Sequence, residues 1–272
     1  MRSHTYLPAG TRDVFVEANF NSWRDDDGWN DELEQTWRNK VEGTAIGLVG
    51  QLIEGKAGDI QRDAAKALAA LHLARSYSFD IVHNRILTQV GANEMRLVEE
   101  DPFYADLFTT EAGRAPEPDE LAERVRLTVE AMKSGRQFLL ERMVYLFNFT
   151  LEFFLTLNVA LLYAPPGMSF LTGDTPVVTR DERGFRIGIR QGVALGDTFG
   201  IFMPLGRKVA MDLYTSEAPP DEVLHPWQVQ MLNLLVARSS MRFLACHPSD
   251  DPARLLADRS YVPAAHKNES RN

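Results

Sequence analysis

Cysteine is almost absent from this chain, since Cys246 is the only one in 272 residues. A single thiol allows no intramolecular disulfide and no multi-cysteine metal site, and such usage is typical of a reducing cytoplasm. Residues 1–8 lack an apolar core of signal-peptide length, so we expect a cytoplasmic protein. A chain of this length buries enough apolar surface to fold without covalent cross-links.

An excess of positive charge is also lacking. The formal net charge is −9, whereas a protein whose main task is to hold a nucleic-acid backbone is expected to be basic. The sequence therefore carries no strong signature of nucleic-acid binding.

The common catalytic motifs are missing as well. There is no Walker-type glycine loop, no dinucleotide glycine fingerprint after a strand and no pair of histidines at zinc-protease spacing. The segment Gly167–Leu171 begins like a Gly-x-Ser-x-Gly elbow but has leucine at the last position. These absences exclude the commonest nucleotide-binding, serine-hydrolase and helical zinc-protease sites.

One apolar run, residues 143–163, is long enough to raise the question of a membrane span. Asn148, Glu152 and Thr156 recur at every fourth position and predict a polar stripe, and a carboxylate in lipid is costly. We interpret this run as a central helix of a soluble core, with no membrane partner. An acid on such a helix needs a partner or a ligand, which makes Glu152 a candidate site residue.

The spacing of apolar residues predicts helices before residue 163 and short strands after Gly167. The predicted helices span residues 31–55, 59–90, 121–133, 143–163 and 222–240, with a loop at 111–118. The predicted strands span residues 168–171, 176–179, 185–189, 199–203, 208–213 and 241–246.

This order predicts an α+β fold, with a helical N-terminal half followed by a small, mainly antiparallel sheet and one long packed helix. We expect an irregular segment at 1–29, a single domain at 30–258 and a flexible tail at 259–272. Within the domain, residues 30–163 are predicted to be helical and residues 164–258 mixed.

The segment Phe170–Val178 places one acid, Asp174, where a short apolar strand breaks into a turn. The glycine before it relaxes the backbone and the proline two residues later stiffens it, a position that suits ligand binding. The simpler interpretation is that Asp174 caps its own turn by accepting backbone N–H bonds.

A catalytic hypothesis pairs Asp174 with Glu152 around a divalent cation that activates water or polarises a phosphoryl oxygen. Both carboxylates would then be metal ligands and catalytic groups. Arg75, Arg238 and Arg242 are the candidate anion-binding residues, although structural ion pairs explain such arginines equally well.

The chain resembles a widespread bacterial family known only as a domain of unknown function. Three segments carry the resemblance: Phe170–Val177, which fits Phe-x-Thr-[Ser/Gly]-Asp-x-Pro-Val, then Phe202–Leu205, and Leu232–Asn233 followed by Arg242–Phe243. Family members open with His-x-x-Pro, whereas this chain has His4-Thr5-Tyr6-Leu7-Pro8, which implies a shortened start. The resemblance implies no reaction.

Two functions remain open. The first is a metal-assisted hydrolase acting on phosphoesters, with Asp174 and Glu152 at its centre. The second is a non-catalytic ligand-binding or protein-interaction domain, with a protein partner or a second copy, in which Asp174 is structural.

Overall fold

The computed structural model describes residues 23–25, 28–30, 32–180, 195–217, 219–241 and 243–256. Helices fill most of the first part of the chain, and short strands most of the second. In chain order the elements are β1 (Trp23–Asp25), β2 (Gly28–Asn30), α2 (Glu32–Trp37), a π-helical stretch (Arg38–Glu42), α3 (Gly43–Ile53), α4 (Asp59–Ala74), α5 (Tyr77–Glu100), α6 (Pro102–Ala112), α7 (Glu120–Ser134), α8 (Arg136–Leu155), β3 (Asn158–Tyr163), β4 (Thr172–Gly173), β5 (Val178–Arg180), a 3₁₀ turn (Leu195–Asp197), β6 (Gly200–Pro204), β7 (Val209–Tyr214), β8 (Glu222–Val223), α9 (Pro226–Ser239), β9 (Leu244–Ala245) and α10 (Pro252–Leu255).

A five-stranded sheet with the order β5-β6-β7-β3-β8 forms the centre of the fold. Its β5-β6, β6-β7 and β7-β3 pairs are antiparallel, and only β3 and β8 run parallel. Two separate antiparallel pairs, β1-β2 and β4-β9, complete the strands. The predicted α+β fold with a small, mainly antiparallel sheet is therefore confirmed.

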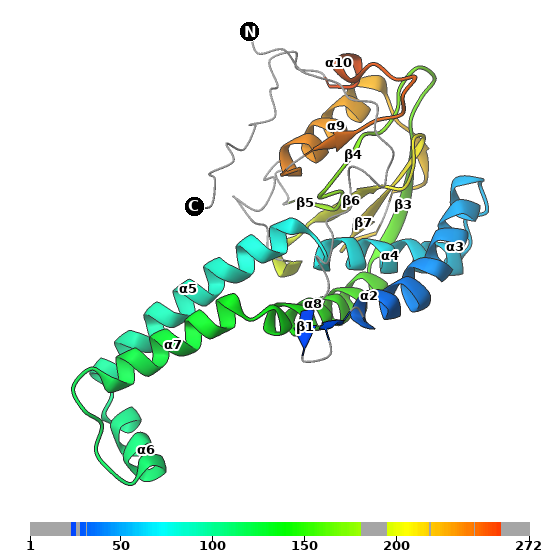
Figure 1. Ribbon diagram of the computed structural model, residues 1–272. Coiled ribbons are helices and arrows are strands. Elements are labelled where there is room, and N and C mark those ends of the chain that lie inside the picture. Colours follow the sequence, from blue (N-terminus) through cyan, green and yellow to red (C-terminus); the bar gives the residue numbers. More distant parts are fainter. Residues whose placement is uncertain are drawn as a thin grey trace.

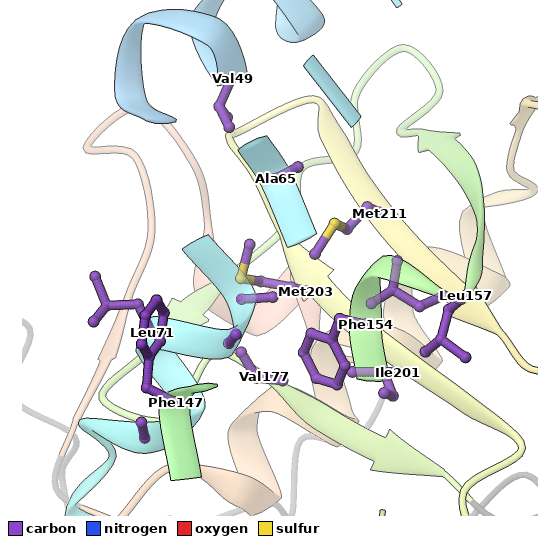
Figure 2. Packing of buried hydrophobic residues seen from close by; sticks show 14 of the residues in the cluster. Val49, Ala65, Leu71, Phe147, Phe154, Leu157, Val177, Ile201, Met203 and Met211 are labelled. Atoms are coloured by element: carbon purple, nitrogen blue, oxygen red, sulfur yellow. The ribbon is translucent and has the colours of Figure 1, made fainter. Parts of the chain in front are cut away.

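Helices α3, α4 and α8 cover one face of this sheet. Successive strand residues point to opposite faces, so Leu161 on β3, Ile201 on β6 and Leu213 on β7 face the same side. They pack against Leu71 of α4 and Phe154 of α8 in one buried cluster, shown in part in Figure 2. Of the two buried clusters that the described residues form, this is the larger.

The opposite face of the sheet is covered by α9. Leu162, Phe202 and Ala210 point to this side and share a second buried cluster with Val229 and Val236 of α9. The sheet thus lies between two helical layers, which is why its strands are apolar on both faces.

Helices α5, α6 and α7 form an arm that leaves this body, as Figure 1 shows. Helices α5 and α7 pack side by side. Helix α6, which connects them in the sequence, lies at the far end of the arm. The chain turns from α5 into α6 at Asp101, whose side chain accepts a hydrogen bond from the backbone N–H of Phe103 (3.0 Å), and Pro102 takes the first helical position.

Two predicted helices end earlier than expected. The helix predicted through residue 163 stops at Leu155, and residues 158–163 form the central strand β3. A short apolar run of valine and leucine suits a strand buried on both faces as well as it suits a buried helix, and pairing with β7 decided between them. None of the described helices combines the length and apolarity that a membrane span requires.

The helix predicted over 59–90 is two helices, because Arg75 and Ser76 leave the helical path between α4 and α5. Ser76 is buried and its hydroxyl donates to the carbonyl of Leu73 (2.8 Å), which satisfies an acceptor at the end of α4. The strand predicted at 185–189 lies outside the described residues.

Candidate functional site

Asp174 joins the turn after β4 to the end of α9. Its Oδ1 accepts a hydrogen bond from the backbone N–H of Met241 (2.9 Å), and its own N–H donates to the carbonyl of Phe243 (3.4 Å). Beside it, β4 pairs with β9, so the segment after α9 is held to this turn on two sides. Asp174 is half-buried. Its carboxylate and its backbone N–H both bind the segment after α9.

Gly173 is required by the close approach of α9 to this turn. A Cβ atom at Gly173 would lie 1.9 Å from Oγ of Ser240 and 3.2 Å from the carbonyl oxygen of Phe243. The Ser240 hydroxyl is itself held by a hydrogen bond to the carbonyl of Val236 (2.8 Å). Glycine in the central Thr-Gly-Asp segment is thus explained by Ser240 on the facing helix end.

Asn233, from the third segment of the family resemblance, is also a structural tie. Its side chain is fully buried in α9, accepts from the N–H of Leu171 (2.8 Å) and donates to the carbonyls of Ser169 (2.9 Å) and Leu255 (3.2 Å). A buried amide with three partners fixes the strand-like stretch before Asp174 against α9.

Glu152 is exposed on α8, together with Asn148 and Thr156. The predicted polar stripe exists, but it faces solvent, because Met143 and Phe147 on the other side of α8 enter the larger core. Glu152 therefore needs no buried partner. Helix α8 and the Asp174 turn also belong to different layers, since Asp174 is bonded to the α9 segment on the opposite face of the sheet.

No three histidine, cysteine, aspartate or glutamate side chains converge into a metal-binding group anywhere in the described part of the chain. The donor set proposed around Asp174 and Glu152 thus has no third protein ligand among these residues.

The candidate anion-binding arginines differ in their surroundings. Arg75 bonds Glu42 and Glu34 (2.6 Å to Oε1 of Glu34) and lies over the ring of Trp37, 5.8 Å from its centroid. Its charge is thus neutralised within the α2–α4 region. Arg238 is exposed in the last turn of α9, where a cation interacts favourably with the helix dipole. Arg242 lies outside the described residues.

A buried ionic cluster that sequence reasoning missed lies on the α9 face of the sheet. Arg180 on β5 pairs with Asp212 on β7, and the hydroxyl of Tyr214 donates to the same carboxylate (2.7 Å). Asp212 is only 2% exposed, and among the described residues its Oδ1 and the Nε of Arg180 have no hydrogen-bond partner. The one available signal was an aspartate within the apolar strand Val209–Tyr214.

Burial raises the pKa of Asp212 above its ordinary value, although Arg180 and Tyr214 favour the ionised form. Burial, together with the charge of Asp212, also raises the pKa of Tyr214. Asp212 is thus enclosed in the sheet, whereas the side chain of Arg180 is 17% exposed and Tyr214 is partly exposed.

A polar cleft of about 690 Å³ lies at the edge of β3, within the size range of small-ligand sites. Its cations are engaged by the protein. Arg62 pairs with Asp221 (2.7 Å) and donates to the carbonyl of Val159 (2.9 Å), while Lys66 contacts Asp63 (3.1 Å). The lining residues are Asp59, Arg62, Asp63, Lys66, Leu157, Asn158, Val159, Glu217, Pro219, Pro220 and Asp221.

The Arg62–Asp221 pair extends the sheet just before β8 begins. Asp221 Oδ1 accepts from the N–H of Leu161 (2.8 Å), and Arg62 donates to the carbonyl two residues earlier. A residue of a parallel neighbouring strand makes the same two bonds, one as donor and one as acceptor. The pair therefore covers a strand edge that would otherwise expose unpaired peptide groups.

Fold and site together define a three-layer α+β protein in which the notable polar groups tie elements to one another. Residues 1–250 match the model of a family described as "Protein of unknown function (DUF4238)", and the chain belongs to that family. No curated protein and no solved structure matches it.

Proposed function

We propose that this protein is a non-catalytic protein-interaction domain in which Asp174 is structural. The observation that carries this proposal is the hydrogen bond from the backbone N–H of Met241 to Asp174 Oδ1. Through this bond the predicted catalytic carboxylate holds the end of α9. Asp174 therefore lies in a different layer from Glu152. The metal-assisted phosphoester hydrolase is the function against which this proposal is tested.

The helical arm supports the same proposal. Three helices with 50 residues in total extend from a body whose described residues already form two buried apolar clusters. Extended helices of this kind add much solvent-exposed surface and little core, so a contact with another molecule accounts for them better than stability does.

The test compares Asp174→Asn with Asp174→Ala. Asparagine retains an oxygen that accepts from Met241, whereas alanine leaves that N–H without its partner, so we expect a loss of roughly 1–3 kcal/mol of unfolding free energy for alanine and a smaller loss for asparagine. Asp197→Asn is the matched control, because Asp197 stands in the similar Gly-Asp-Thr triplet and is exposed. Urea unfolding measures all three.

Thermal midpoints with Mg²⁺, Mn²⁺ or a chelator, and turnover of phosphomonoester and phosphodiester reporters, separate the two functions. On our proposal the midpoints of parent and Asp174→Asn respond equally to metal. A metal-dependent rise confined to the parent, with reporter hydrolysis that both Asp174 variants lose, would instead establish the hydrolase.

A further inference from the structure

Almost the whole net charge of the protein lies at the far end of the arm. Residues 94–123, which contain the end of α5, α6 and the start of α7, hold ten acidic and two basic side chains. Their net charge is −8, against −9 for the complete chain. The remaining 242 residues are thus close to neutral, and we call residues 94–123 the arm tip.

Several of these carboxylates are exposed and make no ion pair or hydrogen bond with the described residues. They are Glu99, Asp106, Glu117 and Asp119. Other acids are paired within the tip, as in Arg96–Glu100 (2.6 Å) and Arg114–Glu120 (2.6 Å). Glu111 and Glu123 pair with Arg124 (3.6 Å) and Arg126 (2.5 Å), which follow the tip directly in α7. These exposed acids give the arm tip a negative electrostatic potential.

The same tip exposes apolar surface. Phe103 and Leu107 lie one turn apart on α6 and are 61% and 44% exposed, while Phe108 on the other side of the helix is buried. Asp106 shares the exposed face, since it is three residues from Phe103. Helix α6 thus presents an apolar pair bordered by negative charge, an arrangement that is typical of interaction surfaces.

The tip is held in a defined shape. The guanidinium groups of Arg114 and Arg124 lie over the ring of Phe108, 5.3 Å and 5.9 Å from its centroid. Tyr104 of α6 bonds Glu94 of α5 (3.4 Å), and both Arg114 nitrogens bond Glu120. An ordered surface loses little conformational freedom on binding, which favours affinity.

We propose that the arm tip docks onto a basic protein surface that offers an apolar groove to Phe103 and Leu107. This inference rests on the proposed interaction function and names its partner by charge. Nucleic acid and anionic lipid are repelled by a net charge of −8, and a second copy of this nearly neutral body offers no complementary positive field. A lysine- or arginine-rich protein surface with an apolar groove complements both the negative charge of the tip and the exposed side chains of Phe103 and Leu107.

The test measures binding of the full chain to an amphipathic helical peptide of lysine and leucine by fluorescence anisotropy. Two double variants alter the tip, Phe103→Ser with Leu107→Ser, and Glu99→Lys with Asp106→Lys. Each is expected to weaken binding about tenfold or more, and added salt to weaken binding by the parent.

Matched control variants alter equally exposed side chains of the body. Ile46→Ser with Ile60→Ser changes residues that are 62% and 70% exposed, and Glu217→Lys with Glu222→Lys changes exposed acids near β8. These variants are expected to bind the peptide like the parent. Equal losses in tip and body variants, or equal binding of a peptide with glutamate in place of lysine, would overturn the assignment.

Two further measurements ask whether the arm tip binds a membrane or a second copy of this chain instead of a basic protein. Binding to phosphatidylserine vesicles that depends on Phe103, or a dimer in sedimentation that the tip variants dissociate, would replace the basic protein by a membrane or by a second copy. The proposed interaction function is tested separately. It would fail if proteins with an unchanged arm hydrolysed phosphoesters in a way that depends on Asp174. Unaltered thermal midpoints of the tip variants confirm that only the surface has changed.

Discussion

Arg180 and Asp212 form their ion pair across an intervening strand, directly above Gly200. Arg180 stands on β5 and Asp212 on β7, with β6 between them. A Cβ atom at Gly200 would lie 2.6 Å from Nη2 of Arg180, so the absence of a side chain there lets the guanidinium cross the strand. The pair thus ties three strands together on the α9 face.

Gly200→Ala should therefore destabilise the protein by about 1–3 kcal/mol, because the methyl group displaces an arginine that its partner holds in place. Urea unfolding provides the measurement. Gly47→Ala is the control, since Gly47 occupies an exposed position of α3 and nothing lies within 4 Å of its added Cβ atom. It should stabilise the protein by roughly 0.5–1 kcal/mol. Equal effects of the two substitutions would refute the crossing role of Gly200.

The raised pKa of Asp212 predicts a pH dependence with a definite sign. Between the unfolded pKa of about 4 and the higher folded pKa, the native state binds more protons, so the contribution of Asp212 to stability falls as pH rises. Unfolding free energies of the parent and Asp212→Asn, measured from acidic to neutral pH, should show the advantage of the parent shrinking. An advantage of the parent that grows with pH would mean that the charge of Arg180 lowers the pKa of Asp212 more than burial raises it.

Gly173 and Ser240 should show strong energetic coupling. Gly173→Ala introduces a methyl group into the space of the Ser240 side chain and is expected to cost about 1–3 kcal/mol. Combining it with Ser240→Gly should restore much of this loss, which a double-mutant cycle of unfolding free energies measures. Additive losses would show that the clash lies with the Phe243 carbonyl instead.

Asp221→Ala should open the edge of β3, because it leaves the N–H of Leu161 without an acceptor and Arg62 without its counter-ion. We expect a loss of roughly 1–3 kcal/mol and faster hydrogen exchange at the Leu161 amide. Glu222→Ala, which removes a neighbouring exposed acid, serves as the control. Unchanged exchange at Leu161 in Asp221→Ala would contradict the edge-covering role.

The spacing of apolar residues predicted the bounds of some elements closely. Helix α7 and strand β7 match their predicted ranges within a residue at each end. The prediction was wrong for residues 158–163, where both faces are buried and period no longer separates helix from strand. It was also wrong at Arg75 and Ser76, where a buried serine and a paired arginine end a helix that its apolar pattern alone would continue.

The candidate site was only partly accessible to sequence reasoning. The turn at Asp174 was predicted from its glycine and proline. The simpler interpretation had Asp174 cap its own turn, whereas the bond that its carboxylate accepts comes from Met241, in the segment after α9. That Glu152 lies in another layer than Asp174 could not be derived, because helical spacing gives a residue's face but not the element that the face meets.

The sequence by itself determined the α+β class, the helix-then-strand order and the concentration of negative charge in residues 94–123, because these depend on local composition and spacing. Only the tertiary structure decided that Arg180 reaches Asp212 over Gly200, that Arg62 and Asp221 complete a strand edge, and that α6 presents Phe103 to solvent. Such contacts join residues tens of positions apart, and no local pattern encodes which of them the packed layers bring together.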